Sequence, residues 1–590
     1  MGPLLQRTLR STLGSAVLLA AVTALAMAYT STGGASRGSL VAEMLSNFIL
    51  VLGVQVFIGN TGVLSFGHMA FAQVAAYATA VVAIPLATKN KALPKIPFGL
   101  ESIHMGAFGA TLTAVVVTTV IGAIVGVAVA RAHGLAPTMI TLALLFVVEQ
   151  LVKNWKELTR GAGGLSGIPI LRGNGWLYLG AFIALVVAAF FQEVRIGRFA
   201  VATREDELAA PALGIRVFSS RYAAWVVSIA LTALGGSLRA QSLGSVNPKQ
   251  FTLDAGILVL VMLVVGGMRT VSGAVLGTVL ITAGNELFRQ LGDPSRLDIE
   301  RFPDLFLGVA LLLSMLLRPG GLLGDRDLLG FLRRKMYRPA KAEPITPAIG
   351  TRPLTAEDIE VHFGGFVALD GARVTVRPGE VVGLIGPNGA GKTTLFNVIT
   401  GLVDETAGTV RLGDTDLTTA QPVDVARAGL ARTFQNLRLF PALSVRENVA
   451  LTALVAARHR ADRTRPDVDL LLAEAGLTEW ADRPAGTLDY GNQRRLELIR
   501  AAALAPEYLL LDEPTSGMSD TESLAMVQSV RSVASRIGAG VLVIDHDLGF
   551  ITRISDHIVV LAEGRVLAEG TPDEVRANPA VAEAYLGSQA

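Results

Sequence analysis

The sequence predicts a polytopic all-α membrane domain followed by an α/β domain, and two observations lead to this fold class. Apolar runs follow one another as far as about residue 320, whereas residues 350–590 have the composition of an ordinary soluble domain. Only 17% of the 590 residues are charged, against roughly a quarter in soluble proteins. We therefore expect a transmembrane domain at 1–321, a linker at 322–353 and a second domain at 354–590.

The membrane domain is expected to hold about ten crossing segments, since each needs about 20 apolar residues. Two of them are irregular: 61–84 carries Ser65, Gly67 and His68, and 254–268 is short. Each is a candidate for a broken or re-entrant piece, which a membrane accepts only where protein or a cavity covers the backbone. The ten segments are 12–29, 39–59, 61–84, 105–131, 134–153, 175–194, 221–241, 254–268, 271–291 and 302–317.

The basic residues predict the orientation of these segments, because cytosolic loops are enriched in lysine and arginine. Arg7 and Arg10 place the N-terminus inside, and the arginine-rich loop at 195–220 also falls inside. The lysines at 89–95 fit less well, since ten crossings place them outside. The first segment is similar to a signal peptide, but the nine apolar segments that follow favour an uncleaved helix. We expect both termini and the second domain on the cytosolic side.

Four polar residues within or beside the apolar segments are candidates for a functional role, because such residues are costly in a membrane. They are His68, Glu149, Gln150 and Glu286. Glu149 and Glu286 lie near predicted helix ends, where a side chain can reach the interface. His68 is the candidate for lining a path through the membrane.

Composition excludes several kinds of site. The chain has no cysteine, which removes disulfides, zinc-thiolate sites and thiol catalysis. A net charge of +2 argues against nucleic acid as the main partner. Four prolines between residues 339 and 353 predict an extended linker.

A glycine-rich loop is the first motif of the second domain that indicates a binding site. The strand-like run at 381–385 leads into GPNGAGKTT at 386–394, and an apolar helical pattern follows. Glycines let backbone N–H groups approach phosphate oxygens, and the helix N-terminus adds its dipole. Lys392, the single lysine after Lys341, is expected to reach the β- and γ-phosphates of a nucleotide, and Thr393 to ligate Mg²⁺.

Two further apolar strands end in acidic residues. The run at 508–511 precedes Asp512 and Glu513, and the run at 541–544 precedes an Asp-His-Asp sequence that contains His546. The carboxyl ends of parallel strands meet at one edge of a doubly wound sheet, so these groups are expected to converge on the nucleotide. Asp512 suits a Mg²⁺ contact, Glu513 can orient or deprotonate an attacking water, and His546 can contact the γ-phosphate.

Residues 355–590 resemble the ABC ATPases, whose motifs are present in order. Gln435 in TFQN matches the loop glutamine that senses Mg²⁺ and the permease, and LDYGNQRR at 488–495 matches the signature motif. Phe363 matches the adenine-stacking aromatic, with Phe366 as a rival. The resemblance implies an α/β P-loop ABC ATPase domain with a helical subdomain, ATP and Mg²⁺ as cofactors, and the following roles. Catalytic residues are Glu513, His546 and Gln435; metal contacts are Thr393, Gln435 and Asp512; nucleotide contacts are Phe363, Gly386, Pro387, Asn388, Gly389, Ala390, Gly391, Lys392, Thr393, Thr394, Leu488, Asp489, Tyr490, Gly491 and Gln493.

Two positions depart from that family. Asp489 replaces the signature serine, which in ABC proteins faces the γ-phosphate held by a partner domain. A carboxylate there repels the phosphate unless it is protonated or turned away. Ser519 replaces the usual acidic or amide residue, which puts communication between the two ATP sites in doubt.

Both halves resemble branched-chain amino acid (Liv-type) importers more closely. RTFQNLRLF at 432–440 and EGTPDEVRANP at 569–579 resemble their ATP-binding subunits. NTGVLSFGHMAF at 60–71, GAGGLSGIP at 161–169 and the stretch 197–215 resemble their permease subunits. The last stretch matches the coupling helix that docks on the ATPase, through Gly197, Glu205, Ala209, Ala210 and Gly214.

The resemblance implies an ATP-driven half-transporter of the bacterial cytoplasmic membrane. It would take up branched-chain or other hydrophobic amino acids that an external binding protein delivers. Its partners would be a second permease and a second ATPase, which the family favours as a heterologous pair, although a second copy remains open. A urea or short-chain amide importer is the nearest alternative, and no residue excludes it. An ABC exporter is less expected, because it would have six long helices and no short Glu/Ala/Ala loop.

Overall fold

The computed structural model of the chain describes residues 17, 20–24, 26–30, 35–171, 173–291, 302–324, 350–459 and 467–586. It divides into two compact units. The first unit comprises Met1–Arg204 and Phe218–Tyr337, and the second comprises Glu205–Val217 and Arg338–Ala590. Most of the expected linker, the two N-terminal arginines and much of the segment at 12–29 lie outside the described residues.

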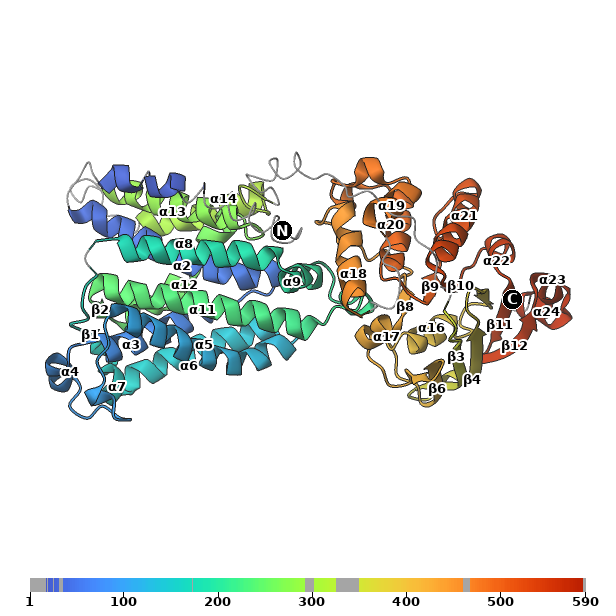
Figure 1. The fold of residues 1–590 in the computed structure, drawn as a ribbon, viewed down its shortest axis with the longest axis horizontal. Helices are drawn as coiled ribbons and strands as arrows, with labels where there is room; N and C mark the ends of the chain where they lie inside the picture. The colour runs from blue at the N-terminus through green and yellow to red at the C-terminus, as the bar shows by residue number, and fades with distance from the viewer. Residues whose placement is uncertain are drawn as a thin grey trace. The chain divides into compact units, whose positions relative to one another are not determined.

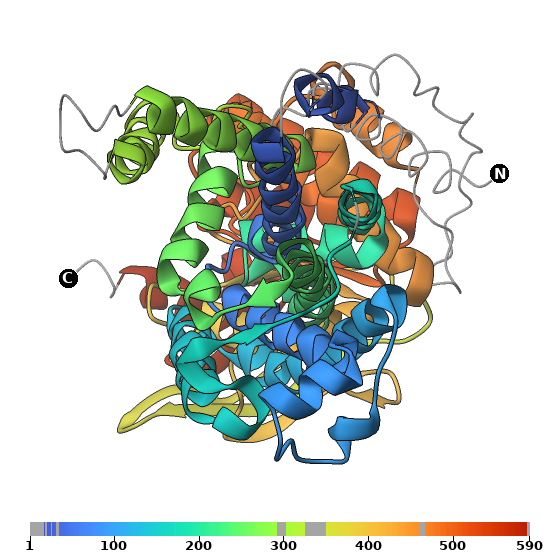
Figure 2. The same cartoon turned by 90° about the vertical axis from the view of Figure 1, so that its left-hand side faces the viewer.

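The first unit is a bundle of apolar helices. Its described part has seven helices that are long and apolar enough to cross a membrane, or eight if one bent pair counts as a single span. Helix α2 packs on α8 and α13, α3 packs on α5, and α12 packs on α13 (Figure 1). Figure 2 shows the same bundle turned by 90°. The main helices are α2 (Ala35–Thr61), α3 (His68–Ala83), α5 (Ala107–Arg131), α6 (Ala136–Asn154), α8 (Gly175–Glu193), α11 (Val217–Leu243), α12 (Leu253–Gly266), α13 (Val271–Leu291) and α14 (Phe302–Leu317).

Small residues bring some of these helices close together. A Cβ at Gly277 of α13 would lie 1.8 Å from the Met262 carbonyl oxygen of α12. A Cβ at Gly266 would lie 1.9 Å from the Gly273 carbonyl oxygen. Close backbone approach through glycine is the usual way in which helices pack in a membrane, where no hydrophobic effect drives their association.

The two irregular segments differ in outcome. The segment expected at 61–84 is broken: α2 runs on through Thr61, Gly62 takes a φ of +72°, and α3 begins only at His68. Helix α3 then bends by 118° into α4 (Leu86–Ala92). The segment expected at 254–268 is instead extended by a 3₁₀ turn, so that Pro248–Gly266 is long enough to cross. Helix α14 has 16 residues and is shorter than the seven spans.

The second unit holds two sheets that share one core. The six-stranded sheet has the order β12-β11-β5-β10-β9-β8 and is parallel except for the edge strand β12. Strands β5, β9 and β10 are buried throughout, as parallel strands covered on both faces are. The strands are β5 (Val381–Ile385), β8 (Leu430–Arg432), β9 (Tyr508–Asp512), β10 (Gly540–Ile544), β11 (His557–Ala562) and β12 (Arg565–Gly570).

The second sheet is antiparallel, with the order β4-β3-β6-β7. Its apolar side chains join those of the first sheet and of α16 (Lys392–Ile399) in one buried cluster. Three helices pack on one another to form the helical subdomain: α18 (Val445–His459), α19 (Val468–Glu474) and α20 (Tyr490–Ala502) (Figure 1). The remaining strands are β3 (Leu354–Phe363), β4 (Phe366–Val376), β6 (Ala407–Leu412) and β7 (Thr415–Asp416); the remaining helices of this unit are α10 (Ala209–Ala212), α17 (Pro422–Ala428), α21 (Asp520–Ile537), α22 (Leu548–Ile554), α23 (Pro572–Ala577) and α24 (Pro579–Leu586).

Candidate nucleotide site and docking segment

The glycine-rich loop lies between β5 and α16. Gly386 and Gly391 have φ values of 153° and 96°, and a Cβ at Gly386 would lie 2.1 Å from the Leu561 carbonyl oxygen. The ammonium of Lys392 donates to the carbonyl oxygens of Gly386 (2.7 Å) and Pro387 (2.9 Å). Burial lowers the pKa of Lys392, and the nearby Glu513 carboxylate opposes that shift. Loop and lysine thus form a narrow cradle at a helix N-terminus, which suits an anion.

Asp512 ends β9, which β10 separates from β5 in the sheet. Its Oδ2 lies 3.4 Å from Nη2 of Arg432, while its buried Oδ1 has no hydrogen-bond partner among the described residues. Burial raises the pKa of Asp512, and the Arg432 guanidinium opposes the shift. The Thr393 hydroxyl, at the start of α16, is on an exposed residue. A carboxylate oxygen and an exposed hydroxyl are oxygen donors of the kind that Mg²⁺ prefers, so these residues fit the ion.

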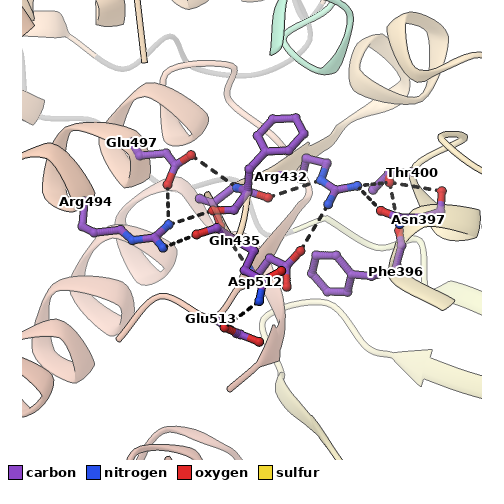
Figure 3. Close-up of polar contacts among 11 residues, drawn as sticks. Phe396, Asn397, Thr400, Arg432, Gln435, Arg494, Glu497, Asp512 and Glu513 are labelled. Atoms are coloured by element: carbon purple, nitrogen blue, oxygen red, sulfur yellow. Dashed lines mark hydrogen bonds and ion pairs between the residues drawn. The ribbon is translucent and has the colours of Figure 1, made fainter. Parts of the chain in front are cut away.

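The three predicted catalytic residues lie together, because Gln435 and His546 both contact Glu513. Its Oε2 accepts a hydrogen bond from Nε2 of Gln435 at 3.1 Å, and its Oε1 lies 2.8 Å from Nε2 of His546 (Figure 3, for Gln435). Its backbone N–H donates to the Ile544 carbonyl oxygen of β10 at 2.8 Å, and its φ is +47°. A non-glycine residue in the left-handed region is strained, and such strain gathers at functional sites.

The signature motif begins helix α20. Asp489 is its N-cap: the carboxylate accepts from the backbone N–H of Asn492 (2.9 Å) and from its side-chain amide (2.7 Å). These hydrogen bonds, the backbone one first, hold the pKa of Asp489 below its usual range. Leu488 is buried, and its carbonyl oxygen accepts from the Gln493 amide at 3.0 Å. The acid at the signature serine position is therefore charged, and its oxygens are engaged by its own helix; Tyr490 and Gly491 follow in the first turn of α20.

Both candidates for the aromatic platform lie on the hairpin between β3 and β4. Phe363 and Phe366 pair across the turn and are 54% and 64% exposed. Each ring is therefore accessible to a planar ligand, and the hairpin favours neither residue over the other as the aromatic platform.

Sequence reasoning missed three buried charged residues of this site. Arg432 and Arg494 lie inside the stretches 432–440 and 488–495, and Glu497 follows the second stretch by two positions; their side chains are 4%, 2% and 2% exposed. Arg494 of α20 donates through Nη1 to the Phe434 carbonyl oxygen (2.7 Å) and to Glu497 (3.0 Å), and through Nη2 to the Gln435 carbonyl oxygen (Figure 3). Burial lowers the pKa of Arg432 to about 10, so it stays charged at neutral pH. The signal available was the arginines that these two stretches contain.

The expected coupling stretch belongs largely to the second unit. We call Glu205–Val217 the docking segment. Glu205 accepts from the Ala442 backbone N–H at 3.1 Å, and Asp206 forms an ion pair with Arg438 at 3.1 Å.

The far end of the docking segment also contacts the second unit. The Gly214 carbonyl oxygen accepts from Nε of Arg427 at 3.0 Å, and Arg216 pairs with Asp424 at 3.0 Å. Arg438 and Ala442, which contact the other end, follow Gln435 within one loop, so the segment lies against the stretch that carries the glutamine.

Small residues in this segment allow close packing. Ala209 and Ala210 are fully buried in α10, which packs on α17. Gly214 has a φ of +77°, and a Cβ there would lie 2.8 Å from Cγ1 of Val455. Gly197, by contrast, lies in α9 (Arg195–Glu205) of the first unit, where a Cβ would meet the Phe191 carbonyl oxygen at 1.8 Å.

The four polar candidates of the first unit differ in their burial and in their contacts. His68 is buried, with Nε2 2.6 Å from the Ser228 hydroxyl and its ring beside Phe57 and Trp225. Glu149 pairs with Lys153 one turn away near the end of α6. Gln150 is exposed and Glu286 is half-buried in α13.

Family models match both halves of the chain. The model described as "Branched-chain amino acid transport system / permease component" matches residues 39–315. The model "ABC transporter" matches residues 369–516, and "Branched-chain amino acid ATP-binding cassette transporter" matches residues 565–590.

Curated relatives match the second half over nearly their whole length. The high-affinity branched-chain amino acid transport ATP-binding protein BraF of Pseudomonas aeruginosa is 40% identical over 257 residues, which are 40% of this chain and 99% of BraF. LivG of Escherichia coli K12, with the same description, is 38% identical over 253 residues, covering 40% of this chain and 97% of LivG. A crystal structure of the ADP conformation of an ABC transporter cassette is 30% identical, covers 40% of this chain and 100% of its own, and has a TM-score of 0.36. The chain thus belongs to the branched-chain amino acid ABC transporter family and carries a permease component and an ATP-hydrolysing cassette in one polypeptide.

Proposed function

We propose that this chain is half of an ATP-driven importer that takes up branched-chain or other hydrophobic amino acids. The permease would occupy residues 1–321 and the cassette 354–590, joined by a linker at 322–353. The observation that carries the proposal is the Glu513 carboxylate, which contacts Gln435 and His546 and interacts electrostatically with Lys392 of the P-loop. The same glutamine-bearing loop contacts the docking segment, which ties hydrolysis to the permease.

Different residues of the cassette bind the phosphates, bind the metal ion and activate the attacking water. The P-loop backbone and Lys392 hold the phosphates; Thr393, Gln435 and Asp512 would hold Mg²⁺, which would neutralise phosphate charge there. Glu513 orients a water and takes its proton as the water oxygen attacks the γ-phosphorus. The bond from that phosphorus to the β,γ-bridging oxygen breaks, and ADP and phosphate leave. His546 donates to a γ-phosphate oxygen as the charge shifts.

The working assembly holds two permeases, two cassettes and an external binding protein. Each ATP lies between one cassette's P-loop and the partner's signature motif, so Asp489 acts at the partner's site. Its carboxylate accepts two hydrogen bonds from Asn492 at the start of α20. These bonds stabilise the negative charge, which lessens its repulsion of the phosphate at that site. The assembly lies in the bacterial cytoplasmic membrane with the cassette and both termini in the cytosol, which the arginines at 7, 10 and 195–220 favour.

Reconstitution tests this function. The full chain is placed in liposomes with its partner subunits, and ATP hydrolysis is measured with a binding protein loaded with leucine, urea or a short-chain amide. We expect stimulation by the leucine-loaded protein only. Stimulation by urea or an amide would move the chain to the alternative importer class. Stimulation by a lipophilic compound without any binding protein would contradict import.

A further inference from the structure

A buried arginine joins three parts of the cassette. Arg432 ends β8, and its Nη1 donates to Oδ1 of Asn397 on α16 (3.0 Å) and to the hydroxyl of Thr400, the C-cap of that helix (2.7 Å). Its Nη2 faces Asp512 on the next strand (Figure 3). The P-loop helix and the Asp512 carboxylate are thus held by one rigid guanidinium, whose planar fork offers donors in fixed directions.

The ring of Phe434 lies next to this arginine and to a second one. The guanidinium carbon of Arg432 is 4.7 Å from the ring centroid, and that of Arg438 is 5.5 Å from it. Phe434 is nearly buried. Two cations held against one aromatic ring attract the ring and repel each other, so the position of one depends on the position of the other.

Arg438 is in turn held by the docking segment. It forms its ion pair with Asp206, whose Oδ1 also accepts the backbone N–H groups of Leu208 and Ala209 at the start of α10. A continuous series of contacts therefore runs from Asp206 through Arg438, Phe434 and Arg432 to Asp512. All of it lies within the second unit.

We propose that Arg432 and Phe434 are positioning residues that tie the docking segment to Asp512 and α16 by a route separate from Gln435. The inference rests on the proposed function. The Gln435 side chain acts on Glu513, whereas this route ends on the metal carboxylate and the P-loop helix. Displacing Arg438 releases one cation from the ring, which shifts Arg432 and with it the Asp512 carboxylate.

A double-mutant cycle tests the route through the affinity for MgATP. The full chain is used in lipid nanodiscs in a Glu513→Gln background, so that bound ATP is not hydrolysed. Arg438→Gln is measured with native Phe434 and with Phe434→Leu, which keeps apolar bulk and removes the ring. We expect Arg438→Gln to change the Kd for MgATP by about threefold or more beside Phe434, and by less than about 1.5-fold beside Leu. Additive effects of the two substitutions would overturn the inference.

Arg432→Lys gives the second arm of the test, because it keeps the charge and loses the fork. We expect it to remove the dependence of MgATP affinity on Arg438 as Phe434→Leu does. The same dependence on Arg438 in Gln435→Ala is expected to persist, and its loss there would assign the link to Gln435 instead. The matched control is Arg352→Lys, since Arg352 pairs with the largely buried Glu507 away from this series. Its effect should add to that of Arg438→Gln. A parent chain that binds no MgATP at all would refute the proposed function rather than this route.

Discussion

Removing the Glu497 carboxylate should loosen the loop that carries Gln435. Glu497 and Arg494 pair at 3.0 Å with side chains only 2% exposed, and Glu497 also accepts the Phe434 backbone N–H at 3.3 Å. Breaking one partner of a buried ion pair costs about 3–5 kcal/mol, because the remaining charge stays buried without compensation. The orphaned N–H adds about 1 kcal/mol. Glu497→Ala should therefore destabilise the cassette by about 4–6 kcal/mol.

Thermal unfolding of the full chain measures this effect. For a domain of this size, about 1 kcal/mol corresponds to roughly 2–4 °C, so the cassette transition should fall by about 10–20 °C. Glu497→Gln keeps an acceptor for the N–H and should lose less. The control is Glu569→Ala, which breaks an exposed ion pair with Arg373 and should shift the transition by less than about 2 °C. A drop for Glu497→Ala no larger than for this control would refute the reasoning.

Three further predictions concern the site and its coupling. Glu513→Gln should retain ATP binding and stop hydrolysis and transport; loss of binding, measured by titration with MgATP, would show that its role is misassigned. Gly214→Val should reduce transport, because a β-branched residue at a φ of +77° is strained and its Cβ would lie 2.8 Å from Val455; transport equal to the parent's would contradict this. The lowered pKa of Asp489 means that its capping stabilises the folded state above its unfolded value of 3.8 and is lost as pH falls through the still lower folded value. The protection factor of the amides in the first turn of α20, which is the intrinsic exchange rate divided by the observed rate at the same pH, should accordingly fall in acid, and Asp489→Ser should remove that dependence; an unchanged profile in the serine variant would count against the cap.

Local motifs made much of the cassette predictable. The P-loop, Asp512, Glu513 and His546 each follow a short apolar strand directly, so their positions at one sheet edge follow from strand–loop chemistry. Arg432 was missed because its partners are remote in sequence: it meets Asp512 only since β8 pairs with β9, 80 positions along the chain. Strand order decides such contacts, and no local pattern encodes it.

The membrane unit was predictable in outline and less so in detail. Apolar length located its helices, but the break at 61–84 depends on the left-handed Gly62 and on where α3 begins. The contact of His68 with Ser228 inside the bundle joins residues 160 positions apart, and no local sequence pattern encodes it. Asp489 looked repulsive toward phosphate, whereas the structure uses its oxygens to cap α20.

The central claim is that this cassette hydrolyses ATP to drive import through the permease on the same chain. The most direct measurement is uptake of labelled leucine into liposomes that contain the full chain and its partner subunits with the cassette facing the lumen, ATP inside and the loaded binding protein outside. Uptake that requires ATP and the binding protein, and that Glu513→Gln abolishes, is the predicted result. Leucine uptake that is unchanged in Glu513→Gln, or ATP-driven movement in the opposite direction, would contradict the account.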